Sequence, residues 1–262
     1  MNIMILAPHQ DDEILGAGGL IQICRSRGDT VKVVFATNGD YQGRSTACRR
    51  YHESRDALAR LGISENEIYY LGYGDTGMHP NHSFLRRLLL SPMDAPLASP
   101  ISSVTYHPAG RRTVRSLRTG QEGLLTKREL LLDLAWCFGT NVPDLLVVPS
   151  LWDTHGDHAA LAALVELARP SAVAVNSVSF LIHGGDDWRW PPRKMEPAAR
   201  PPVVPREVWD ARITLALTPE QQALKRHLIG TFSTQTPQNV NGFLYAFARE
   251  EVFFSLYTHP TR

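Results

Sequence analysis

The amino-acid sequence predicts an α/β fold in which helices cover both faces of a mostly parallel sheet. Short apolar strands alternate with helical segments from the first residues onward. The strands are nearly continuous in apolar side chains, as expected where both faces of a sheet are covered. Glycine-rich loops follow two of them, at the carboxyl ends where open α/β sheets bind their ligands. Together these observations predict a Rossmann-like three-layer α/β/α sandwich.

The chain, residues 1–262, is predicted to form a single domain. Its 262 residues, 43% of them hydrophobic, suffice to bury a large core. Prolines interrupt two segments, near residues 91–123 and 188–205, and regular structure resumes after each, so both are predicted to be loop insertions. The basic run Arg111–Arg118 in the first insertion is either a solvated loop or a rim that attracts an anionic substrate.

The first half of the chain alternates strand and helix in a β-α-β pattern. Gly28 ends the first predicted helix, and Gly62 ends the second. We expect strands at 2–7, 31–36 and 68–71, helices at 14–28 and 46–61, and glycine-rich loops at 37–40 and 72–77.

The second half is less regular. Thr218 is a predicted helix N-cap, with Glu220 in the first turn after it. Residues 101–106 could form one strand between the prolines of the first insertion. We also expect helices at 124–138, at 159–168 and after Thr218, and strands at 144–149, 172–182, 211–217 and 252–257.

A turn rich in acidic residues separates the first strand from the first helix. Asp11, Asp12 and Glu13 stand in a row there, so a cation or another positive partner is needed to offset their repulsion. His9 and Asp12 are three residues apart, a spacing that lets an imidazole and a carboxylate converge on one ion where a helix starts. Asp11 is then left over as a candidate base.

A second turn, at residues 150–158, carries histidines and also lies between a strand and a helix. If both turns lie at carboxyl ends of parallel strands, His9, Asp12 and a histidine of the second turn meet in one crevice. Two imidazoles and one carboxylate leave a fourth position open for water, as in catalytic rather than structural zinc sites.

These residue types support the hydrolysis of an amide or an ester. Zinc lowers the pKa of a bound water towards ~7, so Asp11 can take its proton at neutral pH. The attack creates an oxyanion, which the metal and the other histidine of the pair His155 and His158 can stabilise. Either Asp157 or Asp153 could hold that imidazole in the useful tautomer and keep it protonated.

The two turns resemble motifs of the PIG-L/LmbE family of zinc-dependent N-deacetylases, which remove acetyl or longer acyl groups from amino sugars. The motifs are Pro-His-Gln-Asp-Asp-Glu after the first strand and His-Gly-Asp-His in the second half. The resemblance implies one Zn²⁺ per chain, which other divalent ions could replace, and an N-acyl amino sugar or small glycoside as substrate. It implies that His9, Asp12 and His158 are metal ligands, Asp11 the general base, His155 the oxyanion-polarising residue and Asp157 its support.

The resemblance extends beyond these motifs. Residues 50–62 match the helix that follows the second strand in relatives, and residues 75–78 match a substrate-facing loop. This match makes Arg50 and Asp75 candidates for hydroxyl contacts on the sugar, with a plain ion pair as the alternative. Residues 232–235 match a late family signature. Gln10 and Gly156 replace prolines of the family motifs, but neither is a ligand, so the chemistry is expected to be retained.

Other residues have a functional and a structural interpretation. Glu13 is expected to cap the first helix or to bond a neighbour, and Gly16–Gly19 to pack the helix against a strand rather than to cradle a phosphate. His183 follows a strand at the same end of the sheet and is a candidate substrate-binding residue. Trp188 and Trp190 either stack on a sugar or hold their loop against the body of the protein.

Other classes of protein share some of these sequence features. Gly16, Gly18 and Asp40 imitate a dinucleotide-binding fingerprint, but Ile21 occupies the third glycine position, and the acidic turn puts negative charge where a pyrophosphate would lie. A metal phosphoesterase would prefer two ions and more carboxylate ligands. A non-catalytic sugar- or nucleotide-binding protein remains the alternative to an enzyme.

The composition limits partners and location. A formal net charge of +1 gives no electrostatic reason to expect nucleic acid or an anionic membrane. Cys24, Cys48 and Cys137 suggest neither disulfides nor a cysteine zinc site, so we expect buried thiols in a reducing compartment. No signal-peptide pattern and no apolar run of ~18 residues is present, which predicts a cytoplasmic protein without a membrane segment. Whether it forms a homo-oligomer stays open.

Overall fold

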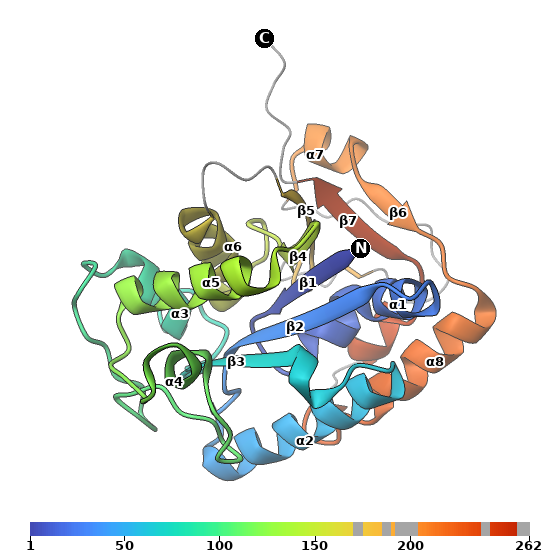
Figure 1. The fold of residues 1–262 in the computed structure, drawn as a ribbon. Coiled ribbons are helices and arrows are strands. Elements are labelled where there is room, and N and C mark those ends of the chain that lie inside the picture. Colours follow the sequence, from blue (N-terminus) through green and yellow to red (C-terminus); the bar gives the residue numbers. More distant parts are fainter. Residues whose placement is uncertain (170–174, 185–189, 192–203, 237–241, 256–262) are drawn as a thin grey trace.

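The computed structural model confirms the predicted α/β fold. It describes residues 1–169, 175–184, 190–191, 204–236 and 242–255. A seven-stranded sheet lies between two layers of helices, in the order β3-β2-β1-β4-β5-β7-β6 (Figure 1). The strands are β1 (Asn2–Ala7), β2 (Thr30–Thr37), β3 (Ile68–Tyr73), β4 (Leu145–Pro149), β5 (Asn176–Phe180), β6 (Ile213–Leu215) and β7 (Glu251–Ser255).

The sheet is parallel from β3 to β5 and antiparallel where β7 pairs with β5 and β6. Because β1 lies between β2 and β4, the carboxyl ends of β1 and β4 are neighbours at one edge of the sheet. The two turns that carry the motifs follow these two strands, so the fold brings them together.

Helices cover both faces of the sheet (Figure 1). Helices α1 (Asp12–Ser26), α2 (Arg44–Arg60) and α8 (Pro219–Gly230) contribute to the hydrophobic cluster on one face. On the other face lie α3 (Phe84–Leu90), α4 (Val114–Thr119), α5 (Lys127–Asn141) and α6 (Gly156–Ala168). The remaining short elements are α7 (Arg206–Asp210) and the 3-10 turns Glu65–Glu67 and Leu244–Phe247.

The central strand shows why the sequence forms this sandwich. Ile3 and Ile5 of β1 point into one cluster, whereas Met4 and Leu6 point into the other. All four side chains are almost completely buried. Successive side chains of a strand alternate between faces, so a continuous apolar strand requires a covering layer on each side.

The strand predicted at 101–106 is wrong. In this segment, only Val104 forms an isolated bridge, with Leu124. The hydroxyl of Ser102 donates to the carbonyl of Val104 and accepts from the N–H of the same residue. Such local side-chain bonds compete with strand pairing.

Three arginines of the basic run make ion pairs within the protein. Arg115 is 4% exposed and pairs with Asp133 at 3.2 Å, while Arg118 contacts Asp133 at 3.0 Å and also Glu129. Arg111 pairs with Glu65. Two of these arginines therefore join the short, unpredicted helix α4 to α5, where the carboxylate of Asp133 offsets their charge.

The glycines of α1 serve packing, as expected. A Cβ built on Gly16 would lie 2.4 Å from the ring of Phe180, and one on Gly19 would lie 2.5 Å from Leu217. Both distances are too short for carbon atoms. The absence of side chains therefore lets α1 pack closely against β5 and the segment before α8.

Gly16→Ala is expected to destabilise the protein by about 1–3 kcal/mol, because overpacking outweighs the better helix propensity of alanine. The matched control is Gly139→Ala in α5, where a new Cβ would meet no atom within 4 Å. That change should stabilise the protein by about 0.5–1 kcal/mol. Urea unfolding measures both, and equal shifts in the same direction would contradict the packing argument.

Two of the three cysteines, Cys24 and Cys137, are buried free thiols, while Cys48 is half-buried. Within the described ranges, no helix combines the length and apolar character needed to cross a membrane.

Candidate metal centre

The first motif turns the chain from β1 into α1. His9 lies in the turn, Asp11 is the N-cap residue, and Asp12 is the first residue of the helix. Asp11 has a φ of 147°, a conformation that favours glycine. Its N–H donates to Oε2 of Glu13 at 2.9 Å, and Ser54 donates to Oε1 of the same carboxylate. Glu13 therefore has the structural role expected of it and helps to hold the strained turn.

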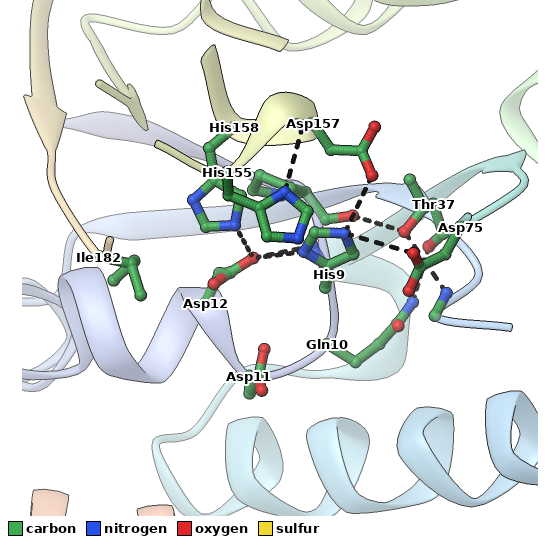
Figure 2. Close-up of polar contacts among 12 residues, drawn as sticks. His9, Gln10, Asp11, Asp12, Thr37, Asp75, His155, Asp157, His158 and Ile182 are labelled. Atoms are coloured by element: carbon green, nitrogen blue, oxygen red, sulfur yellow. Dashed lines mark hydrogen bonds and ion pairs between the residues drawn. The ribbon is translucent and has the colours of Figure 1, made fainter. Parts of the chain in front are cut away.

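The second motif forms the start of α6 beside this turn. His155 is the N-cap residue of α6, and its Nδ1 accepts the N–H of Asp157 at 3.2 Å. His158 lies three residues after His155, in the first turn of α6, and is completely buried. The rings of His9, His155 and His158 converge around Asp12 (Figure 2), and the centroid of His155 is 4.7 Å from each of the other two.

The predicted metal ligands come together on one carboxylate oxygen. Oδ2 of Asp12 lies 3.1 Å from Nδ1 of His9 and 3.2 Å from Nε2 of His158. The three side chains come from the two turns, which are far apart in the sequence. The juxtaposition therefore depends on the pairing of β1 with β4.

Each of these two histidines has a second carboxylate on its opposite nitrogen. Nε2 of His9 lies 3.4 Å from Oδ2 of Asp157, and Nδ1 of His158 lies 3.0 Å from Oδ2 of Asp153. Carboxylates in this position fix the tautomer and the ring orientation of metal-binding histidines. They leave Nδ1 of His9 and Nε2 of His158 as the nitrogens that face Asp12.

This donor set fits a divalent cation. Nε2 of His158 is buried, and its contact among the described residues is the ion pair with Oδ2 of Asp12 at 3.2 Å, which is not counted as a hydrogen bond. An ion would supply the missing partner. Ligand atoms within 4.8 Å of one another also occur in three groups without Asp12: His9, His155 and His158; Asp153, His158 and His183; and His9, Asp75 and Asp157. The first adds His155 to the predicted pair of histidines.

The electric field at the site also favours positive charge. Burial opposes protonation of His9, but Asp75, Asp12 and Asp157 outweigh it and raise its pKa to about 10. Burial likewise opposes protonation of His158, and Asp12 with Asp153 raises its pKa well above the usual value. The negative charge of the same carboxylates would stabilise a bound cation.

His155 differs from the other two histidines. Because its Nδ1 accepts a backbone N–H, the proton of the neutral ring lies on Nε2. Burial, followed by the neighbouring His158 and His9, lowers its pKa well below the usual value. The expectation that an aspartate keeps this ring protonated is therefore wrong. Asp157 supports His155 only through its backbone, since its carboxylate contacts His9.

Asp11 is placed as a candidate base, away from the three rings. Nη2 of Arg50 lies 3.3 Å from its Oδ1. Burial raises the pKa of Asp11 to about 7, against the opposing effect of Arg50 and with a further increase from Asp12. A carboxyl group with this pKa exchanges protons near neutral pH.

The predicted substrate-binding residues lie in the wall of one cavity of about 350 Å³. Arg50, Asp75 and His183 line it together with His9, Asp11, Asp12 and His155. Nη1 of Arg50 is also 3.9 Å from Oδ2 of Asp75, so the two residues form a long ion pair while both face the cavity.

The sequence named none of the other wall residues as site residues, although Met78 and Gln235 lie in stretches that resemble the family; these residues are Leu15, Tyr41, Met78, Ile182, Gln235, Phe243 and Leu244. Tyr41 and Met78 directly follow the two glycine-rich loops, a position that could have marked them. Gln235 belongs to the late signature. Its neighbour Thr234 donates its N–H to Glu53 of α2 at 2.9 Å, which ties the signature to the helix that carries Arg50.

Trp190 packs against the body of the protein. Its side chain is 7% exposed, its indole N–H donates to the carbonyl of Leu181 at 2.7 Å, and its ring packs edge-on against Trp209. Trp190 therefore has the structural role, whereas Trp188 lies outside the described residues.

Fold and site together define a class: α/β proteins with a histidine and aspartate centre at the carboxyl edge of the sheet. The family model described as PIG-L, GlcNAc-PI de-N-acetylase, matches residues 4–169. Since that range is well over half of the chain and contains both motifs, the chain belongs to the PIG-L family. No curated protein matches the sequence significantly.

Solved structures share the fold at low sequence identity. A deacetylase of the antimicrobial A40926 pseudoaglycone is 14% identical over 97% of this chain and 96% of that chain, with a TM-score of 0.60. A deacetylase of teicoplanin biosynthesis is 13% identical over 97% of both chains, with a TM-score of 0.59. The N,N'-diacetylchitobiose deacetylase of Pyrococcus horikoshii is 17% identical over 96% of this chain and 82% of that chain, with a TM-score of 0.56.

Proposed function

We propose that this protein is a metal-dependent hydrolase that removes an N-acetyl or other N-acyl group from an amino sugar or small glycoside. The observation that carries the proposal is the convergence of His9, Asp12 and His158 beside Asp11. Membership of the PIG-L family supports the same reaction, as do the deacetylases with this fold.

Nδ1 of His9, Oδ2 of Asp12 and Nε2 of His158 would hold the ion, which we propose is one Zn²⁺ per chain or another divalent metal. When bound, such an ion lowers the pKa of a water molecule and polarises the carbonyl of an amide. The carboxylates of Asp157 and Asp153 keep the two rings oriented for this task.

Two residues would handle the proton and the negative charge. Asp11 accepts the proton of the attacking water and can later deliver it to the leaving amine, because its pKa is raised. His155 is neutral, so its Nε2–H is available to donate to the oxygen of the amide as negative charge develops there. The carboxylate of Asp157 would then orient His9, whereas its backbone N–H donates a hydrogen bond to Nδ1 of His155.

The sugar would lie against Arg50 and Asp75. Their guanidinium and carboxylate offer donors and acceptors for hydroxyl groups at one side of the cavity. His183 forms another part of the wall, where its ring stacks on Phe243 with centroids 5.7 Å apart. We also propose a cytoplasmic location, which the free cysteines favour; fractionation of cells that express the protein tests it.

Removal of metal is expected to abolish activity reversibly. The purified protein is assayed for primary amine and acetate released from an N-acetylglucosaminide, before and after treatment with a chelator. Zn²⁺, Co²⁺ or Mn²⁺ is then restored in stoichiometric steps, since one deacetylase structure with this fold is of a zinc-inhibited form. Absence of both stoichiometric metal and amine release would favour the non-catalytic binding protein instead.

A further inference from the structure

Asp153 makes more contacts around the centre than its support of one ring requires. Its carboxylate is buried, and Oδ2 accepts from Nδ1 of His158 at 3.0 Å and from the N–H groups of Ile182 at 3.0 Å and His183 at 3.1 Å. Oδ1 accepts the N–H of His155 at 2.8 Å. One side chain therefore contacts a proposed ligand, the residue proposed to polarise the amide and the wall of the cavity.

The bond to His158 determines which nitrogen faces Asp12. A carboxylate only accepts, so Nδ1 of His158 must carry a proton, and Nε2, 3.2 Å from Oδ2 of Asp12, is the nitrogen left to bind a metal. An amide in place of the carboxylate could donate to Nδ1 instead and would then favour a proton on Nε2. In that tautomer the nitrogen cannot bind a metal.

The other bonds determine where the wall after β5 lies. Ile182 and His183 line the cavity. The backbone N–H of each donates a hydrogen bond to Oδ2 of Asp153. Thr154 adds two bonds of its own, from its N–H and its hydroxyl to the carbonyl of His183. The loop after β4 and the loop after β5 are thus joined beside the centre.

We propose that Asp153 is a positioning residue with two tasks: it holds His158 as a ligand through Nε2, and it sets the position of the cavity wall at Ile182 and His183. The proposal rests on the metal-dependent function proposed above. It predicts that metal affinity and substrate affinity depend on the same carboxylate, which is neither a proposed metal ligand nor a proposed substrate contact.

Asp153→Asn tests the proposal. We expect the Zn²⁺ dissociation constant, measured by competition with a chromogenic chelator, to rise about 10–100-fold. With Zn²⁺ at saturation, the KM for an N-acetylglucosaminide should rise as well, because the wall is no longer held. Nitrogen-15 NMR of the Zn²⁺-loaded wild type should show the ring of His158 bound through Nε2 and protonated at Nδ1.

Thr154→Val is the matched control, because it removes the hydroxyl bond between the same two loops but leaves Asp153 in place. It should lower stability while keeping Zn²⁺ affinity at the wild-type value. Asp153→Glu keeps the charge but displaces the carboxylate, and it should also weaken Zn²⁺ binding. This variant decides the question if Asp153→Asn fails to fold.

Wild-type Zn²⁺ affinity in a folded Asp153→Asn or Asp153→Glu variant would overturn the proposal, as would a His158 ring bound through Nδ1. Equal loss of Zn²⁺ affinity in Thr154→Val would reduce Asp153 to a general structural role. These results are separate from the proposed function, because a wild type that binds Zn²⁺ but releases no amine would contradict only the deacetylase activity.

Discussion

Asp11→Asn should lower kcat by about 10²- to 10⁴-fold while the protein retains its metal, because a general base contributes a factor of this size. Asparagine keeps the shape of the side chain, but its amide cannot accept a proton from water. The proposed ligands, His9, Asp12 and His158, are unchanged in this variant. A stopped assay of amine release gives kcat, and plasma mass spectrometry gives metal content.

The wild type should also lose activity as the pH falls through about 7, the value to which burial raises the pKa of Asp11. Only the ionised carboxylate accepts a proton, so the inactive form is the protonated one below this pH. The residual activity of Asp11→Asn should lack this acidic limb. Asp56→Asn, an exposed position on α2, should match the wild type in kcat and in pH profile. Full activity in Asp11→Asn would remove Asp11 from the reaction.

Asp12→Ala should abolish both metal binding and activity. Oδ2 of Asp12 is the atom on which Nδ1 of His9 and Nε2 of His158 converge, so its loss removes one of three proposed ligands and leaves the two rings without a shared anion. Metal is quantified after dialysis against a metal-free buffer, and amine release is measured with and without added Zn²⁺.

The control for this variant is Asp210→Asn, since Asp210 is exposed and pairs only with Arg206 at 3.4 Å among the contacts described for its side chain. It should retain metal and activity. Stoichiometric metal in Asp12→Ala would instead favour the group His9, His155 and His158, whose ligand atoms also lie within 4.8 Å of one another.

Local patterns predicted most of the fold. The strand at β1 and the helix at α1 followed from apolar periodicity and from Gly28, which has a φ of 80° at the helix end. Periodicity failed between residues 91 and 123, because side-chain bonds such as those of Ser102 decide local structure there. The burial of Arg115 depends on Asp133, 18 residues further on, and no local pattern records that partner.

The candidate site was predictable only as far as it depends on residues that are close together in the sequence. Short-range spacing identified His9, Asp11 and Asp12, and the second motif identified His155 and His158, because each set lies within a few residues of one turn. The structure places both sets beside one another, in accordance with the parallel pairing of β1 and β4.

Only the tertiary structure decided which groups support these residues. The residues alone left Asp157 and Asp153 open as the support of a histidine, and the family resemblance implied Asp157 for His155. In the folded chain the carboxylate of Asp157 contacts His9, and that of Asp153 contacts His158. Which nitrogen of a ring faces a neighbour depends on rotamers and on backbone direction, and spacing along the chain specifies neither. The sequence by itself thus determined which types of side chain form the candidate site and which two turns carry them. The folded sheet decided the partners, because hydrogen bonds form between residues that are near in space and not in sequence.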